Sequence, residues 1–253
     1  MPLFYTPDIE FSQELPEEEA AHALRVLRMR KGDELTLTDG KGRFFRALIS
    51  DVAGKRCFVE IVSTEEKPSW KEHLHLAIAP TKNMDRMEWL VEKATEIGID
   101  EISLLDCRFS ERHIVKTERL EKILVAAMKQ SLKARKPTLN EMSSFAEFVR
   151  QPFGGGRYIA HCYSEEEIKA GAENDEDRSL SYRPTEFRAD LQNVLRPGQD
   201  ALVLIGPEGD FSIEEVKLAL SLGFQSVSLG HSRLRTETAA LVAVHLMSMF
   251  SSY

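Results

Sequence analysis

Cysteine is scarce in this chain, and long apolar runs are missing. Its 253 residues include three cysteines, Cys57, Cys107 and Cys162, which lie far apart and form no CxxC pair. Isolated cysteines of this kind are typical of reduced, cytosolic proteins and offer no metal-ligand spacing, so we expect neither disulfides nor a metal site. No apolar run reaches the length of a membrane span. Asp8 and Glu10 stand where a secretory leader would be basic and then apolar, so the sequence predicts a soluble, cytoplasmic protein.

Net positive charge is lacking as well. The formal net charge is −8 at pH 7, which argues against a protein coated in basic surface. RNA binding stays compatible with this balance, because contact with a phosphate backbone depends on local charge. Hydrophobic residues make up 42% of the chain, enough to fill one large domain or two modest ones.

The stretch 201–250 alternates apolar strands, glycine-containing turns and helices. The strand ALVLI runs into the turn 206–209, and a helix begins at Ser212, which fits a capping box with Glu215. A second strand, SVSLG, stops at Gly230, and a last helix follows with a threonine as its expected cap. In an open α/β sheet such strand ends and helix starts meet at the carboxyl edge, where ligands bind. The two loops are therefore predicted to share one site.

The first of these loops also excludes two kinds of ligand. It is not GxGxxG, it places Glu208 where a pyrophosphate would meet negative charge, and no Gly-Lys-Ser/Thr of a phosphate loop follows. A ligand that carries a cation or hydroxyl groups suits the loop better. Taken singly, each loop is equally compatible with an ordinary turn between a strand and a helix.

Residues 1–68 have the pattern of a small β domain. A short helix is expected in AAHALRVLRM, with an apolar face formed by Ala21, Leu24, Val26 and Leu27. Strands separated by glycine-containing turns are expected at Glu34–Thr38, Phe44–Val52 and Arg56–Val62. Short strands of this kind suggest a small barrel.

Two segments are locally basic. Nine basic residues face four acidic ones between residues 20 and 56, and nine face three between residues 108 and 136. A positive face near Phe44 and Phe45 could hold RNA phosphates and a base. The alternatives are a solvated helix face, Glu–Lys pairs along the second segment, and core positions for the two phenylalanines, which we favour.

After a linker at Ser63–Lys71, apolar strands alternate with amphipathic helices. The strand LHLAIAP, a helix over Asp85–Gly98 and the strand ISLLDC predict a mostly parallel α/β domain over residues 73–253. His161 ends a further strand, a position more typical of a structural than of a catalytic histidine. The acidic run 164–190 lacks apolar periodicity and is predicted to be a mobile insertion without chemistry.

The last helix, Thr238–Phe250, is apolar on nearly every side. A helix without a polar face must be buried, either by its own domain or by a partner chain.

Several segments, in the same order along the chain, resemble the RsmE-type ribosomal RNA methyltransferases of the SPOUT superfamily. They cover most of the chain and read HALRVLRMRKGDELTLTDGKG, KNMDRMEWLVEKATEIGI, IGPEGDFS and VSLGHSRLRTETA. The resemblance implies a PUA-like RNA-binding β-barrel at 1–68 and a SPOUT domain with a trefoil knot at 73–253, in a homodimer packed through the last helix. The activity it implies is S-adenosylmethionine-dependent methylation of uridine N3 in small-subunit (16S) ribosomal RNA. A non-catalytic RNA-binding ribosome-assembly factor and another SPOUT specificity are the alternatives.

The resemblance also implies site residues. The cofactor would lie against Ile205, Gly206, Pro207, Glu208, Gly209, Leu229, Gly230, Leu234, Thr236, Thr238 and Ala239. RNA would contact Arg25, Arg28, Arg30, Arg112, Gln130 and Ser131, the last three from a region that borders the catalytic pocket in the family. The chain departs from its relatives at Asp210, where they usually have glycine, and at Leu132-Lys133, where they have Gly-Arg.

Arg235 and Glu237 are the candidate catalytic residues. Uridine N3 carries a proton and is a poor nucleophile, so a catalyst must help to remove the proton or stabilise charge on O2 and O4. The guanidinium fork of Arg235 suits the second task. Glu237 and Glu208 are available as bases, but we favour a role for Glu237 in holding Arg235.

Overall fold

The computed structural model describes residues 2–68, 71–170 and 188–251. The chain divides into two compact units. The first unit combines the described part of Met1–Ser69 with Leu124–Lys136, and the second holds the described parts of Trp70–Ile123 and Pro137–Tyr253. The helix α3 (Glu118–Gln130) therefore begins in the second unit and ends in the first.

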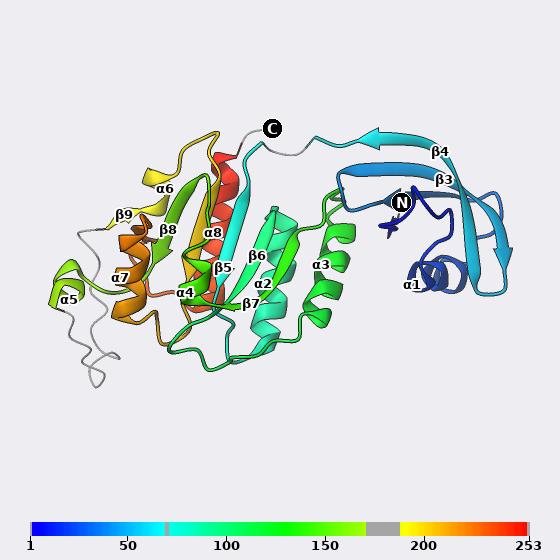
Figure 1. The fold of residues 1–253 in the computed structure, drawn as a ribbon. Helices are drawn as coiled ribbons and strands as arrows, with labels where there is room; N and C mark the ends of the chain where they lie inside the picture. The colour runs from blue at the N-terminus through cyan, green and yellow to red at the C-terminus, as the bar shows by residue number, and fades with distance from the viewer. Residues whose placement is uncertain (1, 69–70, 171–187, 252–253) are drawn as a thin grey trace. The chain divides into compact units, whose positions relative to one another are not determined.

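The first unit is built on a four-stranded sheet in the order β1-β2-β3-β4 (Figure 1). Its strands are β1 (Leu3–Tyr5), β2 (Glu34–Thr38), β3 (Arg43–Ala53) and β4 (Arg56–Glu66). β1 runs parallel to β2, and the other neighbours are antiparallel. Alternate residues of the two central strands form a buried face with Leu35, Leu37, Phe45, Ala47 and Ile49. A small β-sheet domain thus occupies the N-terminal part of the chain, as expected.

The two phenylalanines of β3 have different surroundings. Phe45 belongs to the core and is 2% exposed. Phe44 is half-buried, and the Lys67 ammonium lies 5.7 Å from the centre of its ring. The expected core position is confirmed for Phe45.

The segment that follows α3 is bound to the turn between β2 and β3. The carbonyl oxygen of Ala134 accepts hydrogen bonds from Gly42 N (2.9 Å) and Thr38 Oγ1 (3.2 Å). Lys136 N donates to the carbonyl oxygen of Gly40 at 2.9 Å. These main-chain bonds explain why residues 124–136 belong to the first unit.

Two local expectations for the first unit are wrong. The expected linker begins too early, because β4 continues to Glu66 and pairs Ser63 with Arg46 and Glu66 with Arg43. In the short helix, α1 (Glu17–Ala21) is followed by a π-helical turn, η1 (His22–Val26). Its wider hydrogen bonds rotate the apolar face, which places Ala20 and Ala23 inside and leaves Val26 68% and Leu27 39% exposed.

The second unit is a seven-stranded sheet in the order β7-β6-β5-β10-β8-β11-β9, with every neighbouring pair parallel. Its strands are β5 (Leu74–Ile78), β6 (Glu101–Asp106), β7 (Thr138–Ser144), β8 (Gly156–Ala160), β9 (Ala189–Asp190), β10 (Ala201–Ile205) and β11 (Gln225–Ser228). All residues of β5 and β10 are buried, as their continuous apolar sequences predict for central parallel strands.

Helices cover the sheet. They are α2 (Met84–Ile97), α4 (Phe145–Phe148), α5 (Glu165–Ala170), α6 (Leu191–Val194), α7 (Ile213–Ser221) and α8 (Thr236–Phe250). α2 packs against α8, which also lies against β5 and β10 (Figure 1). α4 contacts β6, β7 and α7, so the predicted α/β architecture is confirmed.

The last helix is buried on one face only. Its inner face holds Ala240, Ala243, Val244 and Met247. The apolar residues that its own domain leaves half-buried are Leu241, Val242, Leu246 and Phe250, and Met249 is 66% exposed. The helix begins at Thr236, two residues before the expected start. Its N-cap is Arg235, which makes no side-chain cap hydrogen bond, so the expected threonine cap is wrong.

The acidic run 164–190 is partly described. Residues 171–187 lie outside the described part of the chain. On either side of them, Glu165–Ala170 forms α5 and Ala189–Asp190 forms β9. Ile168 of α5 packs against the core of the second unit. A single apolar residue gives no periodic pattern in the sequence, so this helix was not expected.

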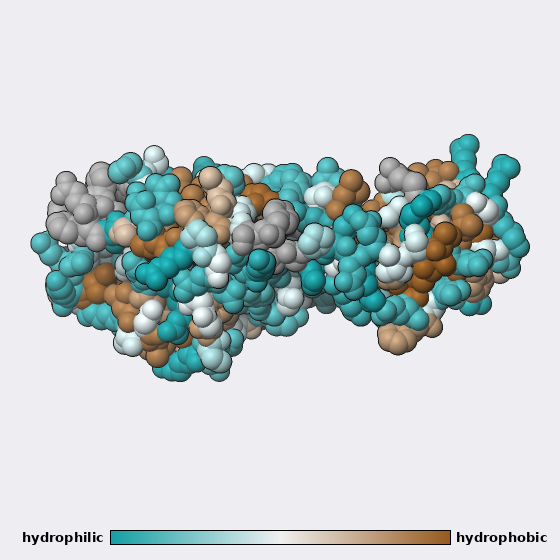
Figure 2. Space-filling view, turned by 90° about the horizontal axis from the view of Figure 1, so that it is seen from above, coloured by the Kyte–Doolittle hydropathy of each residue, from teal (hydrophilic) through white to brown (hydrophobic). Residues whose placement is uncertain are grey.

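The described residues include no helix long and apolar enough to span a membrane. Figure 2 shows hydrophilic side chains over most of the visible surface of each unit, interrupted by smaller hydrophobic areas.

Candidate active site at the carboxyl edge of the parallel sheet

A cavity of about 1130 Å³ lies at the carboxyl ends of the neighbouring strands β10, β8 and β11. Its walls come mainly from the loops after these strands and from the first turn of α8. The strand order reverses at β5: β6 and β7 lie on one side of it, and β10 lies on the other. The cavity lies next to this topological switch point. Open α/β sheets bind ligands at such positions. The volume is comparable with the roughly 1,000 Å³ of a large small-molecule pocket.

The structure brings most of the predicted cofactor residues to this cavity. Those that line it are Ile205, Gly206, Pro207, Glu208, Gly209, Leu229, Gly230, Leu234, Thr236 and Ala239, together with Arg235. Thr238 and Glu237 belong to the same turn of α8 but do not line it. The two strand-end loops therefore share one cavity, as the sheet argument predicts.

Asp210 connects two of the loops. Its side chain turns inward. Its Oδ2 accepts a hydrogen bond from Cys162 N at 2.8 Å, and its Oδ1 accepts one from Phe211 N at 2.7 Å. Desolvation raises the pKa of its carboxyl. The backbone φ of 66° is left-handed, a conformation that glycine adopts without strain and aspartate tolerates through local hydrogen bonds.

Glu208 is engaged rather than available as a base. Its Oε1 accepts a hydrogen bond from Lys82 N at 2.9 Å, in the segment that leads into α2. Arg112, predicted to bind RNA, donates from Nη2 to the carbonyl oxygen of Lys82 at 2.9 Å. Arg112 does not line the cavity. Both side chains thus hold the same neighbouring loop in place.

Glu237 pairs with an arginine that the sequence did not suggest. Its Oε1 lies 3.7 Å from Nε of Arg86, which lines the cavity from the first turn of α2. The side chain of Glu237 is 9% exposed. Its Oε2 has no hydrogen-bond partner among the residues that the structure describes. The expected pairing of Glu237 with Arg235 is therefore wrong.

Arg235 is exposed at the cavity. The structure gives its side chain no ion pair within the described part of the chain. As the N-cap of α8 it stands where the helix begins, so its guanidinium is available to a ligand in the cavity.

His161 has both ring nitrogens occupied. Nδ1 accepts from Tyr163 N at 3.2 Å and from Arg188 Nη1 at 2.9 Å, so the ring proton resides on Nε2, 2.8 Å from Ser226 Oγ. Burial, and secondarily the Arg188 charge, lower its pKa to about 3. Because neither nitrogen is left for a substrate, the structural role that we favoured agrees with the geometry.

The remaining predicted RNA residues lie in the first unit. Gln130 ends α3 and Ser131 follows it, and neither lines the cavity; Ser131 Oγ donates to the carbonyl oxygen of Ala127 at 2.7 Å. Three arginines, all exposed and without an ion pair in the described residues, follow α1: Arg25, Arg28 and Arg30. Lys129, by contrast, is neutralised by Glu19 at 2.5 Å.

Sequence reasoning missed several residues of the cavity. Arg86 lies in the first turn of α2, the helix that follows the central strand β5. Its position after a strand end could therefore have predicted that it lies near the carboxyl edge. Phe109 comes from the loop after β6, and Arg188 precedes β9. These two residues reach the cavity because of the order of the strands in the sheet, which the sequence alone did not provide.

The lining of the cavity offers charged groups of both signs and an apolar part. Half-buried Leu229 and Leu234 supply apolar surface, and the charged lining consists of four arginines and four acidic residues: Arg86, Arg188, Arg233, Arg235, Glu111, Glu167, Glu208 and Asp210. Gly230 has a φ of 114°, and a Cβ built there would meet nothing within 4 Å. It therefore lets the chain turn while leaving cavity volume open.

The chain matches two known domain families. A family described as RNA methyltransferase domain matches residues 68–248, and one described as RNA methyltransferase PUA domain matches residues 15–62. The ribosomal RNA small subunit methyltransferase E of Synechocystis is 30% identical over 242 residues, which cover 93% of this chain and 72% of that protein.

Solved structures agree with these matches. A probable rRNA-methyltransferase from Porphyromonas gingivalis is 45% identical, with a TM-score of 0.86 and coverage of 99% of this chain and 98% of that one. The ribosomal RNA small subunit methyltransferase E from Neisseria gonorrhoeae, solved bound to S-adenosyl methionine, is 27% identical, with a TM-score of 0.78 and coverage of 98% and 97%.

The small N-terminal sheet domain, the parallel sheet with its cavity and the two domain matches define an RNA methyltransferase with a PUA domain. Within that class, the chain belongs to the ribosomal RNA small subunit methyltransferase E family, as the sequence resemblance predicted.

Proposed function

We propose that this protein transfers a methyl group from S-adenosylmethionine to N3 of a uridine in small-subunit ribosomal RNA. The observation that carries the proposal is the cavity at the carboxyl edge, where two strand-end loops and an exposed arginine meet. Family membership supports the cofactor and the substrate class, because the Neisseria relative was solved with S-adenosyl methionine bound.

The cavity residues have distinct tasks in cofactor binding. Main-chain groups around Gly206 and Gly230 would hold the polar parts, and Leu229 and Leu234 would cover the adenine. The carboxylate of Glu208, which lines the cavity, favours a positively charged ligand. When bound, S-adenosylmethionine supplies an electrophilic methyl group whose departure leaves an uncharged thioether.

Arg235 would act on the uridine. Loss of the N3 proton to solvent water spreads negative charge over N3, O2 and O4, and N3 then bonds to the methyl carbon as the carbon–sulfur bond breaks. The guanidinium fork can donate to these oxygens, and its freedom from an ion pair within the described residues leaves its donors available. Orientation of the two reactants within the cavity supplies a further part of the acceleration.

Glu237 is proposed as a positioning residue. It is buried behind the cavity wall and pairs with Arg86, which does line the cavity. Holding the Arg86 side chain at this wall would fix one side of the substrate path. The Glu237→Gln variant keeps the shape and removes the charge, so it should raise KM for RNA more than it lowers kcat.

We also propose that the protein is a homodimer and that its C-terminal domain contains a trefoil knot. The dimer is supported by the outer face of α8, where Met249 is 66% exposed and four more apolar residues are half-buried. Sedimentation equilibrium should give a dimeric mass, and Met249→Lys should shift it toward the monomer.

The decisive experiment uses the full chain, S-adenosylmethionine, and small-subunit ribosomal RNA both free and in assembled subunits. Mass spectrometry of the RNA nucleosides should detect N3-methyluridine. Methylation at a different atom would indicate another specificity of the superfamily. RNA binding with no S-adenosylmethionine binding in calorimetry would replace the enzyme with a non-catalytic assembly factor.

A further inference from the structure

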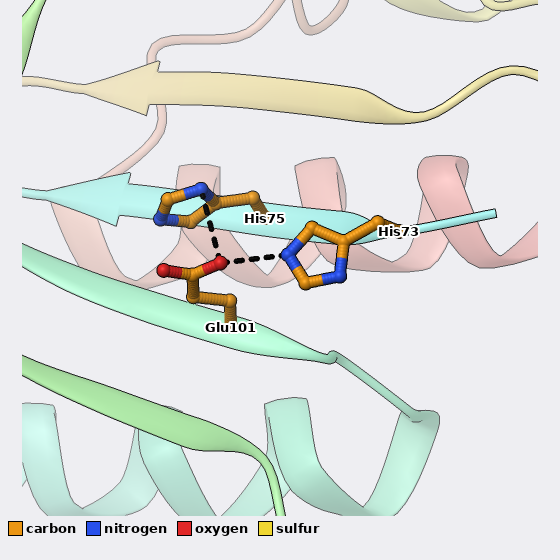
Figure 3. A group of neighbouring side chains, drawn as sticks. All are labelled: His73, His75 and Glu101. Carbon is orange, nitrogen blue, oxygen red and sulfur yellow. Dashed lines mark hydrogen bonds and ion pairs between the residues drawn. The ribbon is translucent and has the colours of Figure 1, made fainter. Parts of the chain in front are cut away.

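A second polar cluster lies at the amino ends of β5 and β6, away from the cavity. It consists of His73, His75 and Glu101 (Figure 3). His73 precedes the first residue of β5, His75 is its second residue, and Glu101 begins β6. The cavity lies at the opposite ends of the strands, so this cluster plays no part in the proposed methyl transfer.

Strand geometry brings the three side chains together. Residues two apart on a strand face the same side, which sets His73 beside His75. Glu101 is the register partner of His75 on the neighbouring parallel strand. One nitrogen of each histidine and one carboxylate oxygen of Glu101 lie within 4.8 Å of one another.

We infer that His73, His75 and Glu101 bind a divalent transition-metal ion of the Zn²⁺ class. An ion about 2 Å from each ligand atom requires ligand atoms roughly 3–4 Å apart. Nδ1 of His75 lies 3.6 Å from Glu101 Oε2, within this range, whereas Nε2 of His73 forms a 2.7 Å hydrogen bond with the same oxygen that an ion would replace. Two imidazoles and a carboxylate form a known three-ligand set for Zn²⁺, with water as the fourth ligand.

His73 is hydrogen-bonded to Glu101, whereas the contact between His75 and Glu101 is not a hydrogen bond. Its 3.6 Å separation exceeds the length of a hydrogen bond. His75 is nevertheless buried, with a side chain that is 7% exposed, and its Nδ1 faces the carboxylate. A cation between the two atoms would satisfy both.

Neighbouring residues form hydrogen bonds with the side chains of His75 and Glu101, as residues around metal ligands commonly do. Nε2 of His75 lies 2.8 Å from Ser103 Oγ, which leaves Nδ1 as the ligand atom. Asn140 Nδ2 donates to Ser103 Oγ at 2.8 Å and to Glu101 Oε1 at 2.5 Å. Such contacts orient metal-binding histidines and carboxylates.

The environment provides charge and access. Asp200 Oδ1 accepts from His73 N at 2.7 Å, and Asp100 Oδ2 accepts from Leu74 N at 2.9 Å, so two further carboxylates lie at the start of β5. The ring of Phe148 packs edge-on against His75 at 5.6 Å. His73 has a side chain that is 43% exposed and gives the ion a path from solvent.

The test titrates ZnCl₂ into the full chain after removal of metals by chelation. Calorimetry should show one site per chain, with Zn²⁺ raising the thermal midpoint. His73→Gln and Glu101→Gln should each weaken binding at least tenfold and abolish the thermal shift. His113→Gln is the matched control, because His113 forms an ordinary pair with Asp106 at 2.7 Å, and it should bind Zn²⁺ as the wild type does.

Co²⁺ provides a readout that does not depend on the variants. The absorption spectrum of the Co²⁺ protein should show nitrogen and oxygen ligation without a thiolate charge-transfer band. Failure of the wild type to bind Zn²⁺, unchanged affinity in both variants, or a thiolate band from a cysteine would each overturn the assignment. In that case the cluster is held by hydrogen bonds and ion pairs alone.

Discussion

The two compact units present their functional groups in different ways. In the first unit, charged side chains stand on the surface of a small, largely antiparallel sheet domain. Arg46 and Arg56 are paired there with Glu34 and Glu14. Arg25, Arg28 and Arg30 are exposed and have no ion pair in the described residues. In the second unit, main-chain loops and half-buried side chains line a cavity.

Strand direction explains this difference. Antiparallel neighbours can be joined by tight turns, which leave little room for a ligand between them, so the groups proposed to bind RNA in the first unit are exposed side chains. Parallel neighbours need long crossovers, and the loops after their carboxyl ends diverge and leave room for a ligand. Substitutions in the first unit should therefore change RNA affinity, and those at the cavity should change cofactor binding or chemistry.

The largest effect is expected for Arg235→Ala. Loss of a donor to the charge that develops on O2 and O4 should lower the rate of methyl transfer at least ~100-fold. Affinity for S-adenosylmethionine, measured by calorimetry, should change little. Arg196→Ala, an exposed arginine outside the cavity, is the control and should retain the rate. A near-normal rate for Arg235→Ala would remove Arg235 from the chemistry.

A smaller effect is expected for Gly230→Ala. The left-handed φ of 114° disfavours alanine, and the added methyl group would enter the cavity. Cofactor affinity should fall about tenfold, equivalent to ~1.4 kcal/mol. Gly198→Ala is matched, since Gly198 has a φ of 78° and open space around its Cβ position, but lies outside the cavity. Equal losses of cofactor affinity in both variants would show that strain alone is responsible.

The comparison is sharpened by the double variant Arg25→Gln/Arg30→Gln. If both arginines contact phosphates, the salt dependence of RNA binding should weaken by about 2 units of log–log slope. Calorimetry should show unchanged cofactor affinity. Arg46→Gln/Arg56→Gln alters net charge equally and removes arginines that are already paired, so its slope should change less. The reverse ranking would contradict the proposed RNA surface.

The smallest effect concerns pH. The unfolded chain protonates His161 near pH 6.5, whereas the folded chain keeps it neutral until about pH 3. Stability is therefore fully present above pH 6.5 and is lost as pH falls toward the folded pKa. Between pH 7 and 5.5 the loss from this group should be about 1 kcal/mol.

Urea unfolding at several pH values measures this loss. Two other charged groups lie near the ring: Arg188, which contacts Nδ1 of His161, and Asp210, which accepts a hydrogen bond from Cys162 N. Both remain in the His161→Gln variant, so their effect on the pH dependence of stability is present in both proteins. That variant should lose less stability on acidification than the wild type. Identical pH profiles would show that His161 does not remain neutral in the fold.

Most regular elements could be predicted from residue patterns. The continuous apolar runs of β5 and β10 and the capping box at Ser212 and Glu215 were found where the sequence placed them. The π-helical turn η1 was not, because no local pattern signals one wider turn. The start of β4 was found, but its end was missed, since that end depends on pairing with β3.

The cavity was predicted in outline, while its polar partners were not. Strand-end loops carry a sequence signal, whereas the pairing of Glu237 with Arg86 requires α2 and α8 to lie side by side. Asp210 and Leu132, where the resemblance implied glycine in relatives, have left-handed φ values of 66° and 54°. The residue types alone do not reveal this backbone conformation.

The sequence by itself determined the alternation of strands and helices, the loops at the carboxyl edge and the family. These depend on local periodicity, turn chemistry and short motifs, which neighbouring residues encode. Only the tertiary structure decided which distant groups meet: Glu237 with Arg86, residues 124–136 with the first unit, and His75 with Glu101. Strand order and register create these contacts, because each joins segments whose separation along the chain hides their proximity.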